Sequence, residues 1–156
     1  MKTIQEKYNA LSKIVHENWI LPLPNKCTPQ DIKYAESIFK VSLPNELKQI
    51  ILKYNGAVPK KDKTKKGNYI DHLISFSKKD RLNASYIYQY MVKEHRMNPL
   101  MIPFAEEANG NYFCLMYRDN NDKNPIIIHW DHEEADIKAA VTIMAKSFKE
   151  FIQGLR

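Results

Sequence analysis

Apolar residues recur every three or four positions in the first third of the chain, and this spacing predicts helices. The first helical face, over residues 8–19, consists of Tyr8, Leu11, Val15 and Trp19. A second helix should begin after Thr28, which can cap it, and end near Lys40. A third should begin at residues 43–46 and end at Asn55-Gly56, because glycine takes the left-handed conformation at a helix end without a steric penalty. The link between these two helices is short, so we expect them to pack as a hairpin.

From residue 69 onward the apolar stretches become shorter and strand-like. We expect a strand over residues 69–76 and then a helix from residue 82 or 83 to residue 95. Tyr86, Tyr88 and Tyr90 lie two residues apart on this helix and cannot all share one face. Tyr86 and Tyr90 should face the sheet, and Tyr88 should point outward. Tyrosine is enriched in protein interfaces, which makes Tyr88 a candidate contact.

The second half of the chain predicts an antiparallel meander. Strands at 101–105 and 112–117 flank Asn109-Gly110, a pair typical of tight hairpin turns. A polar turn at 119–124 leads into a third strand at 125–131. A short strand at 139–141 and a helix should close the chain, and the apolar residues of that helix are Ile143, Phe148, Phe151 and Ile152.

These elements predict an α+β fold, in which an antiparallel sheet packs against several helices. The 156 residues fit one domain, with residues 1–21 as an N-terminal helical extension. The two cysteines, Cys27 and Cys114, are far apart and are expected to be free thiols. Neither a signal peptide nor a run of about 20 apolar residues is recognisable, so we expect a cytoplasmic protein without a membrane span.

The formal net charge of +6 favours acidic partners, and five lysines lie in the segment Lys60–Lys66. We interpret this segment as a solvated loop. Nucleic-acid binding is the alternative, but binders of this kind usually combine basic residues with aromatic side chains that stack on bases. The nearest aromatic residue, Tyr69, lies beyond the run.

Residue patterns typical of enzymes are not recognisable. The chain has four glycines and no glycine-rich phosphate loop, and no serine has the surroundings of a nucleophile elbow. Cys114 falls on a predicted core strand, which favours a buried, inert thiol. We therefore expect no catalytic residue, no cofactor and no small-molecule substrate.

The richest polar cluster is the segment His129–Glu134. On a strand His129 and Asp131 would point to the same side and could hold a metal or move protons, with Asp71-His72 supplying further groups. Charged residues are also ordinary where a strand enters a turn. We favour the interpretation as a solvated strand end anchored by Trp130. A partner-binding surface is the second interpretation, and we expect no metal site.

The order of several short motifs resembles the SUKH superfamily, which includes yeast cell-wall regulators of the Smi/Knr type and many bacterial immunity proteins. In the first half these motifs are Ile32 with Ala35-Glu36, Leu43-Pro44, and Tyr54-Asn55-Gly56. In the second half they are Ile102–Ala105, Asn109–Asn111, Phe113–Leu115, Trp130–Glu133, and Ala145 with Ser147-Phe148 and Phe151. The resemblance covers residues 22–155. Each piece alone is weak, but so many in the same order are hard to produce by chance.

The resemblance implies a protein that binds other proteins and has no catalytic residue set. Our leading hypothesis is an immunity protein that binds a cognate toxin and blocks it, with a regulatory scaffold for cellular proteins as the alternative. Two features depart from the family: Met116 replaces a frequent acidic residue, and the chain is basic, whereas an inhibitor of a basic nuclease would be acidic. The expected contact residues are Asn109, Asn111, Tyr112, Trp130, His132, Glu133, Glu134 and Tyr88.

Overall fold

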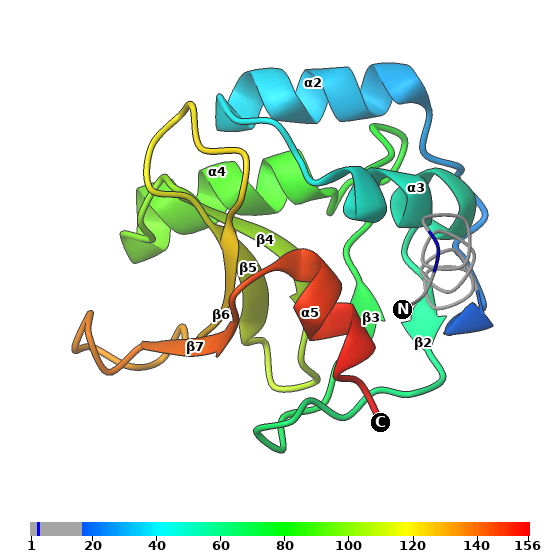
Figure 1. The fold of residues 1–156 in the computed structure, drawn as a ribbon. Helices are drawn as coiled ribbons and strands as arrows, with labels where there is room; N and C mark the ends of the chain where they lie inside the picture. The colour runs from blue at the N-terminus through cyan, green and yellow to red at the C-terminus, as the bar shows by residue number, and fades with distance from the viewer. Residues whose placement is uncertain (1–2, 4–16) are drawn as a thin grey trace.

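The computed structural model describes residue 3 and residues 17–156 (Figure 1). Residues 8–16 of the helix predicted over residues 8–19 therefore lie outside the described residues. Its last residue, Trp19, was wrongly assigned to a helix: it lies in β1 (Trp19–Ile20), which pairs antiparallel with β2 (Val58–Pro59). The extended backbone buries the indole ring, so that Trp19 is 3% exposed.

The two helices predicted next are confirmed as α2 (Pro29–Phe39) and α3 (Asn45–Tyr54). Thr28 and Asp31 cap α2 reciprocally: the Asp31 N–H donates to Thr28 Oγ1 at 3.2 Å, and the Thr28 N–H donates to Asp31 Oδ2 at 2.9 Å. Glu36 connects the two helices, because its carboxylate accepts the Leu43 N–H at 2.7 Å and lies 3.2 Å from Lys48 Nζ.

The predicted meander is also confirmed. The main sheet has the order β3-β4-β5-β6-β7, and all its neighbours are antiparallel. Its strands are β3 (His72–Leu73), β4 (Met101–Glu106), β5 (Tyr112–Met116), β6 (Ile126–Trp130) and β7 (Val141–Ala145). The strand expected over residues 69–76 is regular only at β3, although Ile74 still donates its N–H to the Phe104 carbonyl at 2.9 Å.

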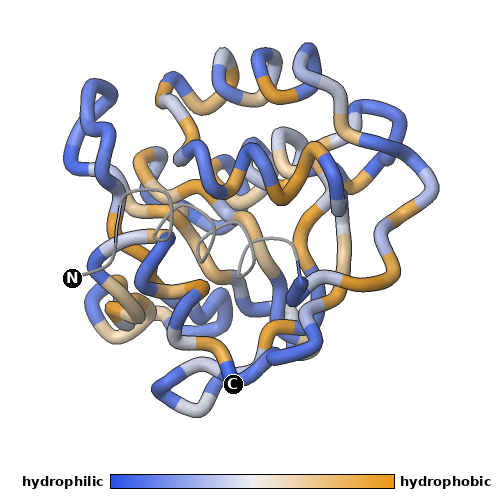
Figure 2. Tube along the Cα trace, turned by 45° about the vertical axis from the view of Figure 1, so that its right-hand side comes forward, coloured by the Kyte–Doolittle hydropathy of each residue, from blue (hydrophilic) through white to orange (hydrophobic). Residues whose placement is uncertain are grey.

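Helices cover both faces of this sheet (Figure 1). On one face α5 (Phe148–Gln153) brings Phe148 and Phe151 against Phe104, with ring centroids 5.4 and 5.8 Å apart. On the other face lies α4 (Ala84–His95), and α2 packs on α4. Hydrophobic stretches run through the middle of the molecule and hydrophilic ones lie in the outer loops (Figure 2). The observed architecture is α+β, as predicted.

The end of the chain differs from the prediction. Ile143 was expected on the closing helix, but it lies on β7 and is 57% exposed. The helix begins later, at Ser147, whose hydroxyl accepts the Glu150 N–H at 3.1 Å. The residues Val141, Thr142 and Ile143 are β-branched, and such side chains favour strands.

Asn55 and Gly56 tie the loop before α2 to the sheet. The buried Asn55 amide donates to the Asn25 carbonyl at 2.9 Å and to Ser75 Oγ at 2.8 Å, and its oxygen accepts the Phe76 N–H at 2.8 Å. Gly56 has φ +69°, as expected for a helix end, and a Cβ there would lie 2.3 Å from Leu23 Cδ1. This close approach places Leu23 against the end of α3.

The helices of the described residues include none that is long and apolar enough to cross a membrane.

Candidate interaction surface

The β4–β5 hairpin turns as predicted, but through a different backbone conformation. Gly110 alone takes a positive φ, of +87°, and its N–H donates to the Glu107 carbonyl at 3.1 Å. This is a type I turn followed by a left-handed glycine, rather than the tighter turn in which both central residues have positive φ. A Cβ at Gly110 would lie 3.2 Å from the ring of His132, so this glycine also makes room for the turn after β6.

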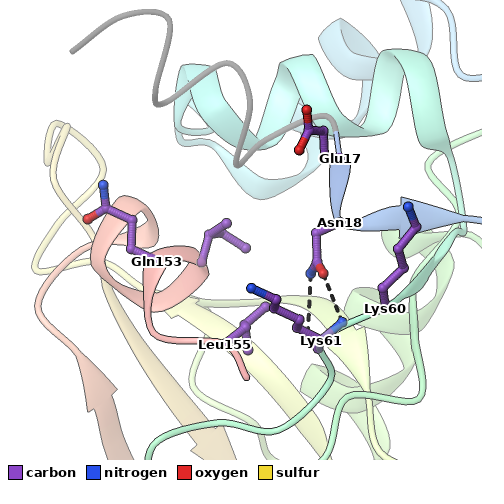
Figure 3. Close-up of a pocket in the computed structure, with 7 residues that line it drawn as sticks. Glu17, Asn18, Lys60, Lys61, Gln153 and Leu155 are labelled. Atoms are coloured by element: carbon purple, nitrogen blue, oxygen red, sulfur yellow. Dashed lines mark hydrogen bonds between the residues drawn. The ribbon is translucent and has the colours of Figure 1, made fainter. Parts of the chain in front are cut away.

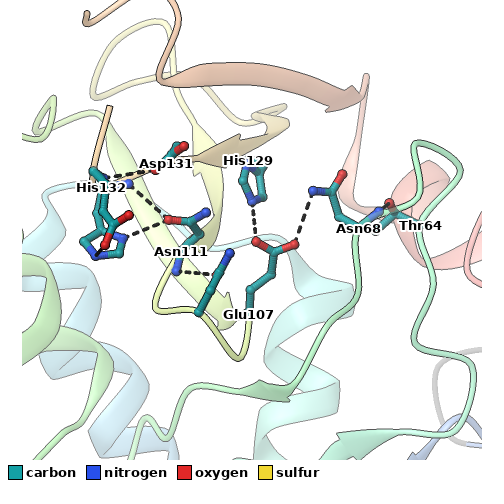
Figure 4. Close-up of polar contacts among 9 residues, drawn as sticks. Thr64, Asn68, Glu107, Asn111, His129, Asp131 and His132 are labelled. Carbon is teal, nitrogen blue, oxygen red and sulfur yellow. Dashed lines mark hydrogen bonds and ion pairs between the residues drawn. The ribbon is translucent and has the colours of Figure 1, made fainter. Parts of the chain in front are cut away.

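Asn111 fixes that second turn against the first (Figure 4). Its side-chain oxygen accepts the His132 N–H at 3.2 Å and lies 2.8 Å from His132 Nδ1. We call residues 107–111 and 131–136 together the rim. Asn111 was expected to be exposed at this rim, but it is buried, since its side chain is needed to hold the two turns together.

A second polar group lies on the other side of the hairpin (Figure 4). Glu107 Oε2 lies 2.7 Å from His129 Nε2, and its other oxygen accepts a hydrogen bond from the Asn68 amide at 3.2 Å. The Asn68 N–H in turn donates to Thr64 Oγ1 at 3.1 Å. Glu107 thus connects strand β6 to the segment that follows the lysines.

The register of the sheet separates the residues that we considered for a metal site. His72, Glu106, Tyr112 and Trp130 form one row across the strands, so His129, next to Trp130, points to the opposite face from His72. Across residues 17–156 no group of three or more histidine, cysteine, aspartate or glutamate side chains is arranged to hold a metal.

Four of the eight expected contact residues are not exposed. Tyr88, Tyr112 and Trp130 are 8%, 6% and 7% exposed, and Asn111 is buried as described above. Tyr112 and Trp130 stack across neighbouring strands at 6.4 Å, and burial, with a smaller contribution from the nearby Glu106 carboxylate, raises the pKa of Tyr112 to about 12. Of the other four, Asn109, Glu133 and Glu134 are exposed and His132 is partly exposed.

The tyrosines of α4 point the opposite way from the prediction. Tyr88 faces inward, with its ring 5.0 Å from that of Phe39 and its hydroxyl donating to the Pro99 carbonyl at 2.8 Å. Tyr86 and Tyr90 are 46% and 44% exposed. The buried residues of α4 include Ala84, Ile87, Tyr88 and Met91, whose spacing of three, one and three is that of a helical face. This pattern was visible in the sequence, but the prediction placed Tyr86 and Tyr90 on the inner face of the helix and Tyr88 on the outer one.

Tyr86 and Tyr90 line a groove that the sequence did not predict. The groove lies between α4 and the β3–β4 edge of the sheet and has a volume of about 660 Å³. We call it the α4 groove; the residues that matter here are Leu23, His72, Leu82, Tyr86, Tyr90 and Glu106.

Carboxylates supply most of the charge in this groove. Glu106 Oε2 lies 3.4 Å from His72 Nε2, and His72 Nδ1 lies 2.8 Å from Asp71 Oδ2. Burial raises the pKa of Glu106; His72 opposes this rise and Asp71 adds to it. Asp80 also lines the groove, where its carboxylate accepts hydrogen bonds from Asn25 and Ser75.

A row of rings connects the α4 groove to the rim. Tyr86 and Tyr90 stack with centroids 6.5 Å apart, His95 lies 5.5 Å beyond Tyr90, and His132 lies 6.4 Å beyond His95. The groove and the rim are therefore parts of one continuous surface.

The lysine-rich segment lies elsewhere (Figure 3). Its backbone is held firmly: Asn18 bonds both the N–H and the carbonyl of Lys61, at 2.8 and 3.2 Å, and Lys63 and Arg156 exchange backbone hydrogen bonds of 2.9 and 3.0 Å. A pocket of about 300 Å³ opens beside Asn18, Lys60 and Lys61 (Figure 3). All five lysines of residues 60–66 are exposed, as expected for a solvated loop.

Both cysteines are free and buried. Burial, with a smaller contribution from Asp31, raises the pKa of Cys27 to about 12, and burial also raises the pKa of Cys114. Neither thiol is readily ionised, so neither has the character of a nucleophile.

The comparison with protein families gives a clear match. Residues 26–154 match the model of the SMI1 / KNR4 family (SUKH-1). The chain belongs to this family. SUKH proteins are generally immunity proteins, and the match spans both helices α2 and α3, the whole main sheet and α5. Among curated proteins, none matches the chain.

Proposed function

We propose that this SUKH protein is an immunity protein that binds a cognate toxin domain and blocks it in a stoichiometric complex. The observation that carries this proposal is the family match over residues 26–154, because SUKH proteins are generally immunity proteins. Protection against a toxin that acts at few copies per cell needs tight binding. A nanomolar to picomolar complex corresponds to about −12 to −16 kcal/mol and usually buries roughly 1,200–2,000 Å².

The surface formed by the α4 groove and the rim supports this proposal physically. It combines half-exposed aromatic side chains with hydrogen-bonding groups, as protein interfaces do. The rim contributes exposed acidic residues, Glu133 and Glu134, and the groove contributes Glu106. Both parts are held by partly buried hydrogen bonds or stacked rings, so little conformational entropy is lost when a partner binds.

The test is co-expression with candidate toxin domains, beginning with any that is encoded beside this chain. We expect cells that produce both proteins to grow, and cells that produce the toxin with a SUKH protein from another locus to stop growing. A catalytically inactive toxin should also form a one-to-one complex with the purified protein in size-exclusion chromatography. Cells that die equally fast with and without the protein, together with the absence of a complex, would exclude immunity to that toxin.

A further inference from the structure

Tyr86 and Tyr90 differ from three other tyrosines of the described residues in what lies over their rings. Three tyrosines elsewhere have a lysine ammonium over the ring: Lys78 lies 4.4 Å from the Tyr34 centroid, Lys53 lies 5.4 Å from Tyr54, and Lys63 lies 5.7 Å from Tyr69. Tyr86 and Tyr90 stack on each other instead, and within residues 17–156 no lysine or arginine lies over either ring, although the His95 ring lies 5.5 Å from that of Tyr90. The negative faces of two rings are thus available in the groove.

The charge of the groove also suits a cation. Its lining includes the carboxylates of Asp80 and Glu106 and a single histidine, and it contains no lysine or arginine, although the chain as a whole has a net charge of +6. Asp80 already accepts hydrogen bonds through both of its oxygens. In the described part of the chain the one ion-pair partner of the Glu106 carboxylate is His72, and the Glu106 side chain is 27% exposed.

Apolar side chains complete the groove. Leu23 is 41% exposed and Leu82 is 63% exposed, which is unusual for large aliphatic residues that line one concave site. The volume of about 660 Å³ lies within the range of about 300–1,000 Å³ that specific binding pockets have. The groove can therefore take several side chains of a partner segment at once.

We propose that the α4 groove binds a segment of the toxin in which an arginine or lysine is flanked by apolar side chains. The cation lies against the rings of Tyr86 and Tyr90 and pairs with Glu106, and the apolar side chains contact Leu23 and Leu82. This inference rests on the proposed function, because it names the contact through which the toxin is held.

The first experiment measures the affinity of an inactive form of the toxin domain identified by co-expression for four versions of the full chain. We expect Tyr86→Ala combined with Tyr90→Ala to weaken binding at least 100-fold, as loss of aromatic hot spots does. Glu106→Gln, which keeps the shape and removes the charge, should weaken it about 10-fold. Tyr69→Ala removes a tyrosine outside the groove that is at least as exposed, at 54%, and should change affinity less than threefold. All variants are first compared by their urea unfolding midpoints.

The outcomes separate the two proposals. Tight binding by the unchanged protein and by the groove variants alike would overturn the groove inference and leave the immunity function in place. Absence of binding by the unchanged protein would overturn both. Loss of binding in Tyr69→Ala as well as in the groove variants would place the contact elsewhere and also contradict the inference.

The second experiment identifies the occupant. A photo-crosslinking phenylalanine analogue placed at position 90 is irradiated in the toxin complex, and the joined peptide is sequenced by mass spectrometry. We expect one toxin peptide that contains an arginine or lysine next to apolar residues. Replacement of that basic residue by glutamine should weaken binding about 10-fold, and by a smaller factor when Glu106 is already glutamine, because only the contact with the rings is then left to lose. A crosslinked peptide without a basic residue would overturn the proposed chemistry.

Discussion

At the scale of single residues, Gly56 shows how one backbone conformation shapes the α4 groove. Its φ of +69° lets α3 end and lets the chain approach Leu23, whose N–H donates to the Asn55 carbonyl at 2.9 Å. The Leu23 side chain occupies the space that a Cβ of residue 56 would need, and it forms part of the groove wall. Gly56, which the sequence predicts as the end of a helix, therefore also positions the apolar side chain of Leu23.

Replacement of Gly56 by alanine separates these two roles. We expect Gly56→Ala to lower the free energy of unfolding by about 2–3 kcal/mol, because a positive φ costs an L-residue about 1–2 kcal/mol and the new Cβ also displaces Leu23. Gly67→Ala is the matched control: its φ is +92°, but its Cβ would meet nothing within 4 Å, so only the backbone cost of about 1–2 kcal/mol applies. Urea unfolding of both variants checks this. An equal loss in both would mean that Leu23 moves aside without cost.

At the scale of secondary structure elements, Glu107 acts as a connector between β6 and the segment after the lysines. Its carboxylate is only 12% exposed and His129 is 10% exposed, so the pair is shielded from water. Loss of the carboxylate would leave the His129 ring and the Asn68 amide without their partner in a nearly dry site. Such unsatisfied groups cost more than the bond itself contributes.

We expect Glu107→Ala to destabilise the protein by about 2 kcal/mol and to loosen the segment of residues 60–70 locally. Hydrogen–deuterium exchange should show faster exchange of the Asn68 and Thr64 N–H groups, while the amides of α4 change little. Glu133→Ala is the control, since Glu133 is exposed at the rim. Unchanged exchange in residues 60–70 would show that the backbone bonds to Asn18 and Arg156 hold the segment without Glu107.

The elements that the sequence predicted well carry their signals locally. Thr28 and Asp31 form a capping box, and the alternation of polar turns and apolar stretches marks β4, β5 and β6. The same kind of signal was available for α5, since Ser147 and Glu150 also have capping-box spacing, but the apolar residues before Ser147 hid it. β3 was predicted too long, because buried apolar residues beyond it need not lie in a strand: Phe76 packs with its ring 6.4 Å from that of Phe39 in α2.

At the scale of the whole molecule, the interaction surface was the part least predictable from sequence. The rim turns were found, but burial of Asn111, Tyr112 and Trp130 depends on how the turns and α4 pack together. The α4 groove combines residues 23, 72, 82–91 and 106, which no local pattern relates to one another. Only the position of Tyr86 and Tyr90 on the exposed side of α4 could have been deduced, from the spacing of the apolar residues around Tyr88.

The distribution of charge over the molecule leads to a last prediction. The lysines of residues 60–66 dominate the net charge, yet none of them lines the α4 groove. Replacement of Lys60, Lys61, Lys63, Lys65 and Lys66 by glutamine lowers the formal net charge from +6 to +1. Long-range charge acts on the association rate, whereas dissociation depends on the groups in contact.

We therefore expect the dissociation rate of the toxin complex to change less than about twofold in this variant. At low salt the association rate of this variant should differ from that of the unchanged protein. The association rates of the two proteins should converge near 1 M salt, where the Debye length is about 3 Å. Surface plasmon resonance across a salt series measures both rates. A dissociation rate that rises about tenfold at every salt concentration would place the lysines in the interface, and the α4 groove would then be at most one part of the contact.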